Sequence, residues 1–143
     1  MMISTKGRYA LRVMIDLAEH QTEGYIPLKE IAQRQEISEK YLESILKILV
    51  QKKFLTGLRG KGGGYRLTRD PEMYTVGSIL RLTEGTLAPV ACLENDAAPC
   101  ERVGECRTLP LWQGLFKLIN DYFDGTTIAD LMASSQDGDN YII

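Results

Sequence analysis

The stretch Arg59-Gly60-Lys61-Gly62-Gly63-Gly64-Tyr65 decides how this sequence folds. Its four glycines and two cations, with no acidic residue, make a backbone that turns sharply and can approach an anionic surface closely. Residues 65–68, directly downstream, alternate as a β-strand does. Upstream lie two helical patterns, over residues 27–35 and 38–53, joined by a short turn. Helix, turn, helix and a basic glycine-rich hairpin are the order of a winged helix-turn-helix, so we expect double-stranded DNA as the ligand.

Charge is divided unevenly along the 143 residues. Residues 1–70 hold 13 Lys and Arg against 8 Asp and Glu, a net charge of +5, whereas residues 71–143 hold 4 against 11, a net charge of −7. A basic N-terminal half and an acidic C-terminal half indicate divided roles, with the basic half suited to nucleic acid.

Several functional classes are disfavoured. No apolar run approaches the roughly 20 residues of a membrane span, and the N-terminus is not a signal peptide, so we expect a cytoplasmic protein without a membrane partner. The single histidine, His20, is expected at the end of the first helix, in a helix-terminal role. With no nucleophile beside a recognisable base and no phosphate loop, the chain is not expected to be an enzyme.

Hydrophobic periodicity predicts a mainly α-helical fold with a small β-wing. Beyond the two helices before the wing, helices are expected over residues 4–20, from Thr75 or Ser78 to Leu82, over 108–123 and over 128–133. The expected organisation is a winged helix-turn-helix domain over residues 1–85, an irregular cysteine-bearing sensor loop over 86–107, a long and a short helix over 108–133, and a flexible tail over 134–143.

The helix over residues 38–53 is the candidate base-reading helix. Its buried stripe is expected at Tyr41, Leu42, Ile45, Leu46 and Leu49. The exposed face then presents Lys40, Glu43, Ser44 and Lys47 to a DNA groove, where carboxylate suits a cytosine amino group and lysine suits phosphate or guanine. In the wing, Arg59 and Lys61 suit the narrow minor groove. The alternative is that these are ordinary solvated charges and that the hairpin is a plain turn.

The three cysteines, Cys92, Cys100 and Cys106, have the spacing C-x7-C-x5-C in the irregular segment. A structural disulfide is disfavoured in the cytoplasm. Three thiolates on one loop can converge on iron or zinc, because both metals accept soft sulfur ligands. Two other interpretations stay open, namely small apolar fillers and a thiol–disulfide switch.

Three segments carry a family resemblance: Ser4-Thr5-Lys6-Gly7-Arg8-Tyr9-Ala10, Tyr41-Leu42-Glu43 and the stretch 59–65. They resemble the signature segments of the IscR-type bacterial regulators (the Rrf-two family), and the resemblance covers nearly the whole chain. Members of this family are dimeric winged-helix repressors or activators. The resemblance implies that Tyr41, Glu43 and Arg59 meet DNA, and that the long helix after Thr108 is the dimerisation helix of a homodimer.

The resemblance also implies a cofactor. IscR-type members hold a 2Fe-2S cluster with three cysteines of this loop, and nitric-oxide-sensing members hold a 4Fe-4S cluster. We therefore expect an iron–sulfur cluster on Cys92, Cys100 and Cys106, with 2Fe-2S first, and 4Fe-4S or no cluster as alternatives. Two ligand positions depart from the family, because the expected histidine is Leu109 and the expected N-terminal aspartate is Arg8. The fourth ligand would then be a residue of the partner chain, an external thiol, or an acid of the loop: Glu94, Asp96, Glu101 or Glu105.

The C-terminal residues Tyr141, Ile142 and Ile143 follow a polar segment. They are expected either to fold back onto a core or to dock into a carboxylate-binding pocket of a partner. This ending resembles the tails of CymR-type regulators and of serine acetyltransferase, which engage cysteine synthase. The leading hypothesis is a DNA-binding transcriptional regulator that senses iron–sulfur status, redox state or nitric oxide through its cysteines. The alternative is a cysteine-metabolism repressor controlled by cysteine synthase at this tail, with the cysteines as a thiol switch.

Overall fold

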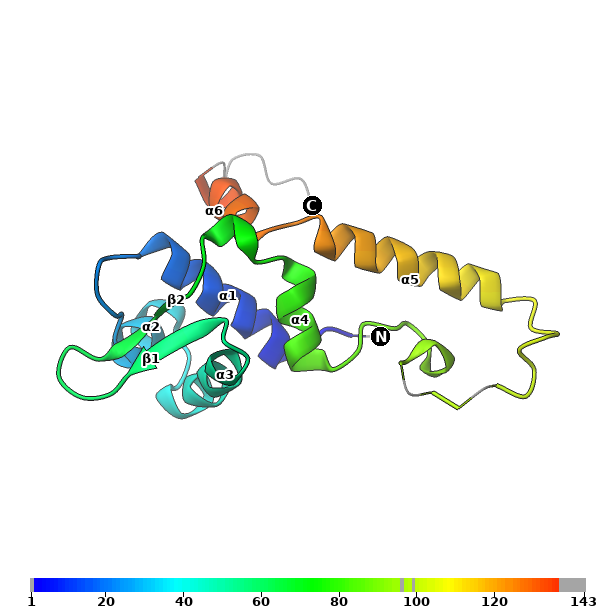
Figure 1. The fold of residues 1–143 in the computed structure, drawn as a ribbon, viewed down its shortest axis with the longest axis horizontal. Coiled ribbons are helices and arrows are strands. Elements are labelled where there is room, and N and C mark those ends of the chain that lie inside the picture. The colour runs from blue at the N-terminus through cyan, green and yellow to red at the C-terminus, as the bar shows by residue number, and fades with distance from the viewer. Residues whose placement is uncertain (1, 96, 99, 137–143) are drawn as a thin grey trace.

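The protein is mainly helical and carries one two-stranded antiparallel sheet (Figure 1). The structure, a computed structural model, describes residues 2–95, 97–98 and 100–136. None of the described helices has the length and hydropathy needed to cross a membrane. The elements in chain order are α1 Thr5–Glu19, α2 Leu28–Gln35, α3 Glu39–Gln51, β1 Leu55–Leu58, β2 Gly64–Leu67, η1 Pro71–Met73, α4 Val76–Glu84, η2 Ala91–Leu93, α5 Leu109–Asp124 and α6 Ile128–Gln136.

Short polar side chains begin most of these helices. The hydroxyl oxygens of Ser4, Ser38 and Thr75 each accept a hydrogen bond from the backbone N–H three residues later, at distances of 3.0, 3.2 and 3.0 Å. Such caps satisfy backbone donors that the helix itself leaves unpaired. At α6, the Thr127 hydroxyl accepts from the Asp130 N–H while the Asp130 carboxylate accepts from the Thr127 N–H. The helices expected from periodicity are therefore present.

Several helix ends differ from expectation by one to three residues, for example at α2 and α6. Pro27 precedes α2 with ψ at 143°, so it lies just outside the helix rather than in its first turn. The helix α6 continues to Gln136, beyond the expected end at residue 133, and so takes in the start of the segment expected to be a flexible tail. Helix ends depend on the last few hydrogen bonds, which hydrophobic periodicity does not report.

The core lies around α1. This helix buries Ala10, Val13, Met14 and Leu17, which follow one helical face, against α2, α3, α4 and α6. Ile128 of α6 is fully buried in the same cluster. The chain therefore returns to the winged-helix body after α5.

A buried ion pair joins α1 to α2. Asp16 is 1% exposed and accepts two hydrogen bonds from the Arg34 guanidinium, at 3.0 and 2.8 Å, and a third from the Gln35 side-chain amide at 2.8 Å. Asp16 raises the pKa of Arg34 above its usual value through this hydrogen bond. A carboxylate removed from water is stable only with partners of this kind, so the pair fixes how α1 and α2 are placed.

The wing is a hairpin in which Leu55 faces Leu67 and Leu58 faces Gly64. Its second strand also pairs with the loop before α2, because Ile26 and Tyr65 exchange backbone hydrogen bonds of 2.9 Å. Gly64 lies at this junction with a φ of +148°, and a β-carbon there would lie 2.1 Å from the carbonyl oxygen of Ile26. The close approach of the two backbones therefore requires glycine.

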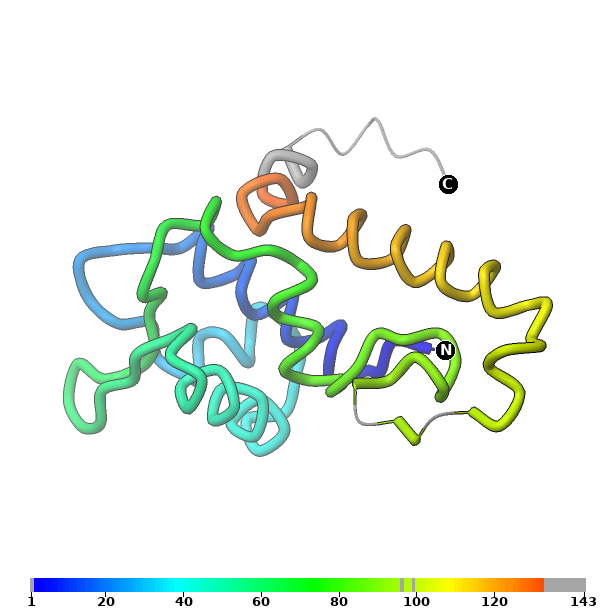
Figure 2. The backbone as a smooth tube through the Cα atoms, turned by 45° about the vertical axis from the view of Figure 1, so that its right-hand side comes forward, coloured from blue at the N-terminus to red at the C-terminus, as the bar shows by residue number. Residues whose placement is uncertain are grey.

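The long helix α5 extends away from the winged-helix body, and the segment 86–107 runs to its far end (Figures 1 and 2). An ion pair holds the near end of α5 to α4. The Arg81 guanidinium donates to both carboxylate oxygens of Asp124, at 2.7 and 2.9 Å, and to the Asn120 side chain at 2.8 Å. A β-carbon at Gly77 would lie 2.0 Å from the Asp124 carboxylate, so this glycine allows the contact.

Replacing Gly64 with alanine is expected to destabilise the protein by about 2 kcal/mol or more, because the new methyl group meets backbone that cannot move aside. Gly24→Ala is the matched control, since its β-carbon meets only the Thr22 hydroxyl, at 3.9 Å. Urea unfolding of both variants measures the difference. Equal unfolding free energies would show that the wing tolerates a side chain at residue 64.

Candidate nucleic-acid interface and cysteine cavity

A groove of about 670 Å³ separates α3 from the wing. Glu43 and Lys47 reach it from α3, and Arg59 reaches it from the wing. The rest of the lining comes from three segments. The wing contributes Gly57, Leu58, Gly63, Gly64 and Tyr65, the start of α2 contributes Pro27 and Leu28, and the end of α3 contributes Val50 and Gln51. Three of the predicted DNA-binding residues therefore meet in one concave surface beside the candidate base-reading helix.

The other predicted DNA-binding residues lie around this groove. Lys40 and Ser44 are exposed on α3, and the Ser44 hydroxyl donates to the carbonyl oxygen of Tyr41 at 2.6 Å. Lys61 is exposed at the tip of the wing, between two glycines with positive φ. Binding of these residues to DNA stays a prediction.

The expectation that Tyr41 belongs to the buried stripe of α3 is wrong, because this side chain is 37% exposed. Its ring meets the ring of Tyr9 from α1 edge to face, with 5.8 Å between the centroids. The Arg12 guanidinium covers the same Tyr9 ring at 4.9 Å. Tyr41 therefore packs at the rim of the domain, where part of its ring faces solvent.

Tyr65 is a groove residue that sequence reasoning did not single out. Burial raises the pKa of its phenol above the usual value, the Glu43 carboxylate adds to the rise, and Arg59 opposes it. The ring lies 3.4 Å from where a β-carbon of Gly57 would be. Finding this contact requires the register of β1 and β2, which the sequence alone did not supply.

The three cysteines line a second cavity, of about 220 Å³, between the loop and the first turns of α5. Leu109 and Gln113 of α5 and Val103 of the loop complete much of its wall. Leu109 is the residue at the position where the family resemblance led us to expect a histidine. Within the described residues, no three His, Cys, Asp or Glu side chains lie close enough together to hold a metal ion.

Cys106 differs chemically from an ordinary thiol. Its sulfur lies 3.4 Å from the Thr108 hydroxyl, and this hydrogen bond is the main reason that its pKa falls below the usual value. The Arg102 charge contributes in the same direction. A lowered pKa populates the thiolate, which is the form that binds metals and attacks disulfides.

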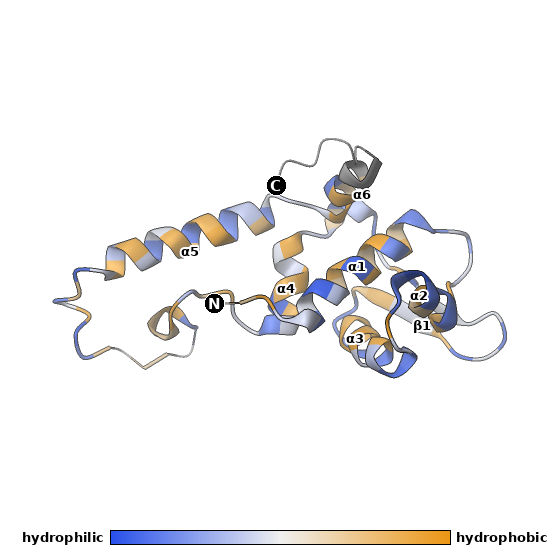
Figure 3. Cartoon of the chain, turned by 180° about the vertical axis from the view of Figure 1, so that it is seen from behind, coloured by the Kyte–Doolittle hydropathy of each residue, from blue (hydrophilic) through white to orange (hydrophobic). Residues whose placement is uncertain are grey.

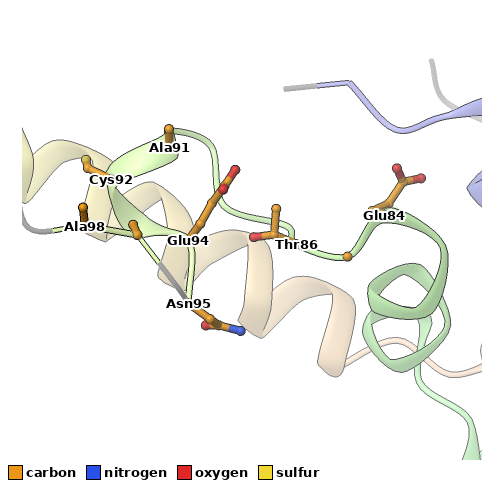
Figure 4. A pocket seen from close by; sticks show the side chains of 9 residues that line it. Glu84, Thr86, Ala91, Cys92, Glu94, Asn95 and Ala98 are labelled. Atoms are coloured by element: carbon orange, nitrogen blue, oxygen red, sulfur yellow. The ribbon is translucent and has the colours of Figure 1, made fainter.

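Of the candidate fourth ligands, Glu94, Glu101 and Glu105 do not line the cysteine cavity. Glu94 lines a neighbouring cavity of about 640 Å³ together with Cys92 and Glu84 (Figure 4). Glu101 and Glu105 are exposed on the loop, and Asp96 lies outside the described residues.

His20 ends α1, with its Nδ1 atom 2.8 Å from the carbonyl oxygen of Asp16. Tyr141, Ile142 and Ile143 also lie outside the described residues.

The helix α5 has two apolar stripes. The inner stripe, Phe116, Ile119 and Phe123, packs on a buried cluster formed by Val76 and Leu80 of α4 with Leu87 of the following segment. The outer stripe is exposed, and its spacing of four, three and four residues is that of a helix-pairing seam. It consists of Leu111, Leu115, Leu118 and Tyr122, which are 62, 38, 68 and 72% exposed. In Figure 3, orange hydrophobic positions recur along the ribbon of this projecting helix.

The groove, the wing and the helix pair α2 and α3 define a winged helix-turn-helix protein. Residues 3–134 match the Rrf2 family, described as "Iron-dependent Transcriptional regulator", and the chain belongs to this family. The fold expected from the sequence is confirmed. Because its relatives are named as transcriptional regulators, the chain is a regulator rather than an enzyme.

Relatives of two kinds resemble the chain over most of its length. The HTH-type transcriptional regulator CymR of Bacillus subtilis is 41% identical over 139 residues, which cover 97% of this chain and 94% of CymR. The structure of that protein, described as the global cysteine regulator of B. subtilis, superposes with a TM-score of 0.75 over 94% of this chain and 98% of the other. IscR of T. potens, 32% identical, superposes with a TM-score of 0.73 over 100% of this chain and 94% of the other.

Lys47→Ala and Arg59→Ala are each expected to weaken DNA binding, because each removes a cation that can neutralise a phosphate. The slope of log K against log salt should then fall by about one for each phosphate that is no longer neutralised. Lys117→Ala is the control, because it removes the same charge from α5, away from the groove. Fluorescence anisotropy on a duplex enriched from a random-sequence pool at several salt concentrations measures both quantities. Wild-type affinity and slope in both groove variants would rule out the groove as the interface.

Proposed function

We propose that this regulator binds double-stranded DNA as a homodimer and that the state of Cys92, Cys100 and Cys106 sets its affinity. The observation that carries the proposal is the single cavity that all three cysteines line, beside the first turns of α5. The loop that bears them joins α4, which packs on the winged-helix body, to the projecting helix. A change of ligand or oxidation state there alters the connection between the DNA-binding body and the dimerisation helix.

The proposal of a homodimer rests on the outer stripe of α5. Four large apolar side chains in a continuous row favour burial by a second helix of the same kind. Pairing about a two-fold axis covers both stripes at once, since each copy offers the same surface. Such a dimer presents two wings and two copies of α3 to successive half-sites on one face of a duplex.

An iron–sulfur cluster is the ligand that we propose for the cysteine cavity. Cys92, Cys100 and Cys106 would hold it, and their three thiolates suit iron. When bound, such a cluster supplies a centre that responds to oxidants and to nitric oxide. Glu94 is available near Cys92 as an oxygen ligand, and a partner-chain residue or an external thiol are the alternatives. Because the thiols share a cavity without forming a preassembled metal site, ligand binding would draw the loop together.

The second candidate is a cysteine-metabolism repressor in which the cysteines form a thiol switch. The lowered pKa of Cys106 favours it, because a thiolate reacts faster with oxidants and disulfides than a thiol does. The 41% identity with CymR favours it as well. In this candidate, cysteine synthase binds the C-terminal residues Tyr141, Ile142 and Ile143.

Purification without oxygen is expected to yield a coloured protein with broad absorption between about 320 and 460 nm and stoichiometric iron and sulfide. Cys92→Ser, Cys100→Ser and Cys106→Ser are each expected to lose most of this iron, because three thiolates are needed. The measurements are the visible spectrum and metal and sulfide analysis of each protein.

One control variant and three further measurements separate the candidate functions. Glu72→Gln removes an exposed carboxylate far from the loop and should keep full iron content. A colourless wild-type protein that stays colourless after anaerobic reconstitution would contradict the cluster. If its DNA affinity then changes on mild oxidation, the thiol switch is supported, and loss of cysteine synthase binding on deletion of Ile143 would support the tail interaction.

Leu118→Glu is expected to weaken self-association by about 100-fold or more, since it places two charges in the apolar seam of the dimer. Met73→Glu is the matched control, because Met73 is similarly exposed, at 63%, but lies in η1 away from α5. Sedimentation equilibrium at micromolar concentration measures the difference. A wild-type dimer that survives Leu118→Glu would place the interface elsewhere.

A further inference from the structure

The carboxylate of Glu84 closes the N-terminal end of α1. Its Oε1 atom accepts hydrogen bonds from the Ser4 backbone N–H at 3.0 Å and from the Ser4 hydroxyl at 2.7 Å. The Ser4 hydroxyl oxygen in turn accepts from the Gly7 N–H at 3.0 Å and so caps the helix. A negative charge at this end also interacts favourably with the positive end of the helix dipole. Residues 80 positions apart in sequence are therefore joined through one oxygen atom.

The sequence around the contact is shaped to allow it. A β-carbon at Gly7 would lie 2.3 Å from the same Glu84 oxygen and 3.0 Å from the Thr83 hydroxyl. Glycine at this position therefore lets the end of α4 approach the first turn of α1. A shift of the Glu84 carboxylate away from the start of α1 would break both hydrogen bonds to Ser4.

Glu84 also adjoins the cysteine loop. Glu84 is the last residue of α4, and the loop begins at Gly85, whose φ is +78°. Glu84 also lines the cavity of about 640 Å³ that Cys92 and Glu94 line from the opposite side (Figure 4). A rearrangement of the loop therefore acts on the final turn of α4, where Glu84 is held.

The first turns of α1 contact α3, the candidate base-reading helix. Tyr9 lies two residues after Gly7 and meets the ring of Tyr41 in the first turn of α3. Arg12 covers Tyr9 and also donates from Nε to the Gln35 side chain at 3.1 Å, which ties the aromatic pair to the end of α2. The cysteine loop is thus joined to Glu84 through the backbone at Gly85, and contacts run from Glu84 through the first turns of α1 to α3.

We propose that Glu84 is the positioning residue that couples the cysteine loop to the recognition helix. The proposal rests on the proposed function, namely that the state of the cysteines sets DNA affinity. Glu84 lines neither the groove between α3 and the wing nor the cavity that all three cysteines line. Through its hydrogen bonds to Ser4, Glu84 makes the position of the start of α1 depend on the position of the cysteine loop. A shift of α1 then reaches Tyr41 through the contact with Tyr9.

The experiment measures one ratio: the dissociation constant of the alkylated protein for an enriched duplex divided by that of the reduced protein. Iodoacetamide alkylates thiols only in the cysteine loop, because all three cysteines of the chain lie there. We expect a wild-type ratio of about five or more, and a ratio within about twofold of one for Glu84→Ala. Glu84→Gln retains a carbonyl acceptor for both Ser4 donors and is expected to recover most of the wild-type ratio. Glu72→Gln, the charge-matched control, keeps the full ratio.

The outcomes separate the coupling from the proposed function. A wild-type ratio of one would overturn cysteine control itself, and with it the coupling. A wild-type ratio well above one that persists in Glu84→Ala would overturn the role of Glu84 and leave cysteine control intact. A purely structural role would lower the affinity of both forms equally, so the ratio would be unchanged. Thermal unfolding of Glu84→Ala verifies that the domain is folded when the ratio is measured.

Discussion

The buried carboxylate of Asp16 is the constraint on which the DNA-binding domain depends. Removing Arg34 would leave the buried Asp16 carboxylate without its charged partner, at a cost of several kcal/mol. Because Asp16 binds both Arg34 and Gln35, it fixes the end of α2 against α1. The turn that follows then determines where α3 lies relative to the wing. The shape of the groove between α3 and the wing therefore depends on an ion pair whose residues do not line the groove.

The helix α5 has two apolar faces, and they have different roles. Its inner stripe and the Arg81–Asp124 ion pair attach it to α4, while its outer stripe faces away from the body. The Arg81 hydrogen bonds lower the pKa of Asp124, so this part of the attachment is present above the usual titration range of a carboxylate and is lost as pH falls through the lowered value. The pair is partly exposed, so its contribution is about 1 kcal/mol. Packing of the inner stripe thus provides most of the attachment.

Features encoded by neighbouring residues were predictable from the sequence, whereas features that join distant residues were not. The caps at Ser4, Ser38 and Thr127 act within three residues, so the helices could be placed. The four-residue strand β1 has no clear alternation, and it is defined by its pairing with β2. The spacing of the cysteines indicated a shared site but not the cavity wall that α5 supplies. The hydrogen bonds between Ser4 and Glu84 leave no periodic signal at all.

In the proposed dimer, the exposed outer stripe of α5 would link the folding of this protein to its abundance. A chain that buries these side chains only in a dimer gains stability from each increase in total protein concentration. At low copy number the same sequence is a less stable species with one wing and with apolar surface available to other proteins. The cellular level of the chain would therefore act as an input in its own right, alongside whatever the cysteines detect.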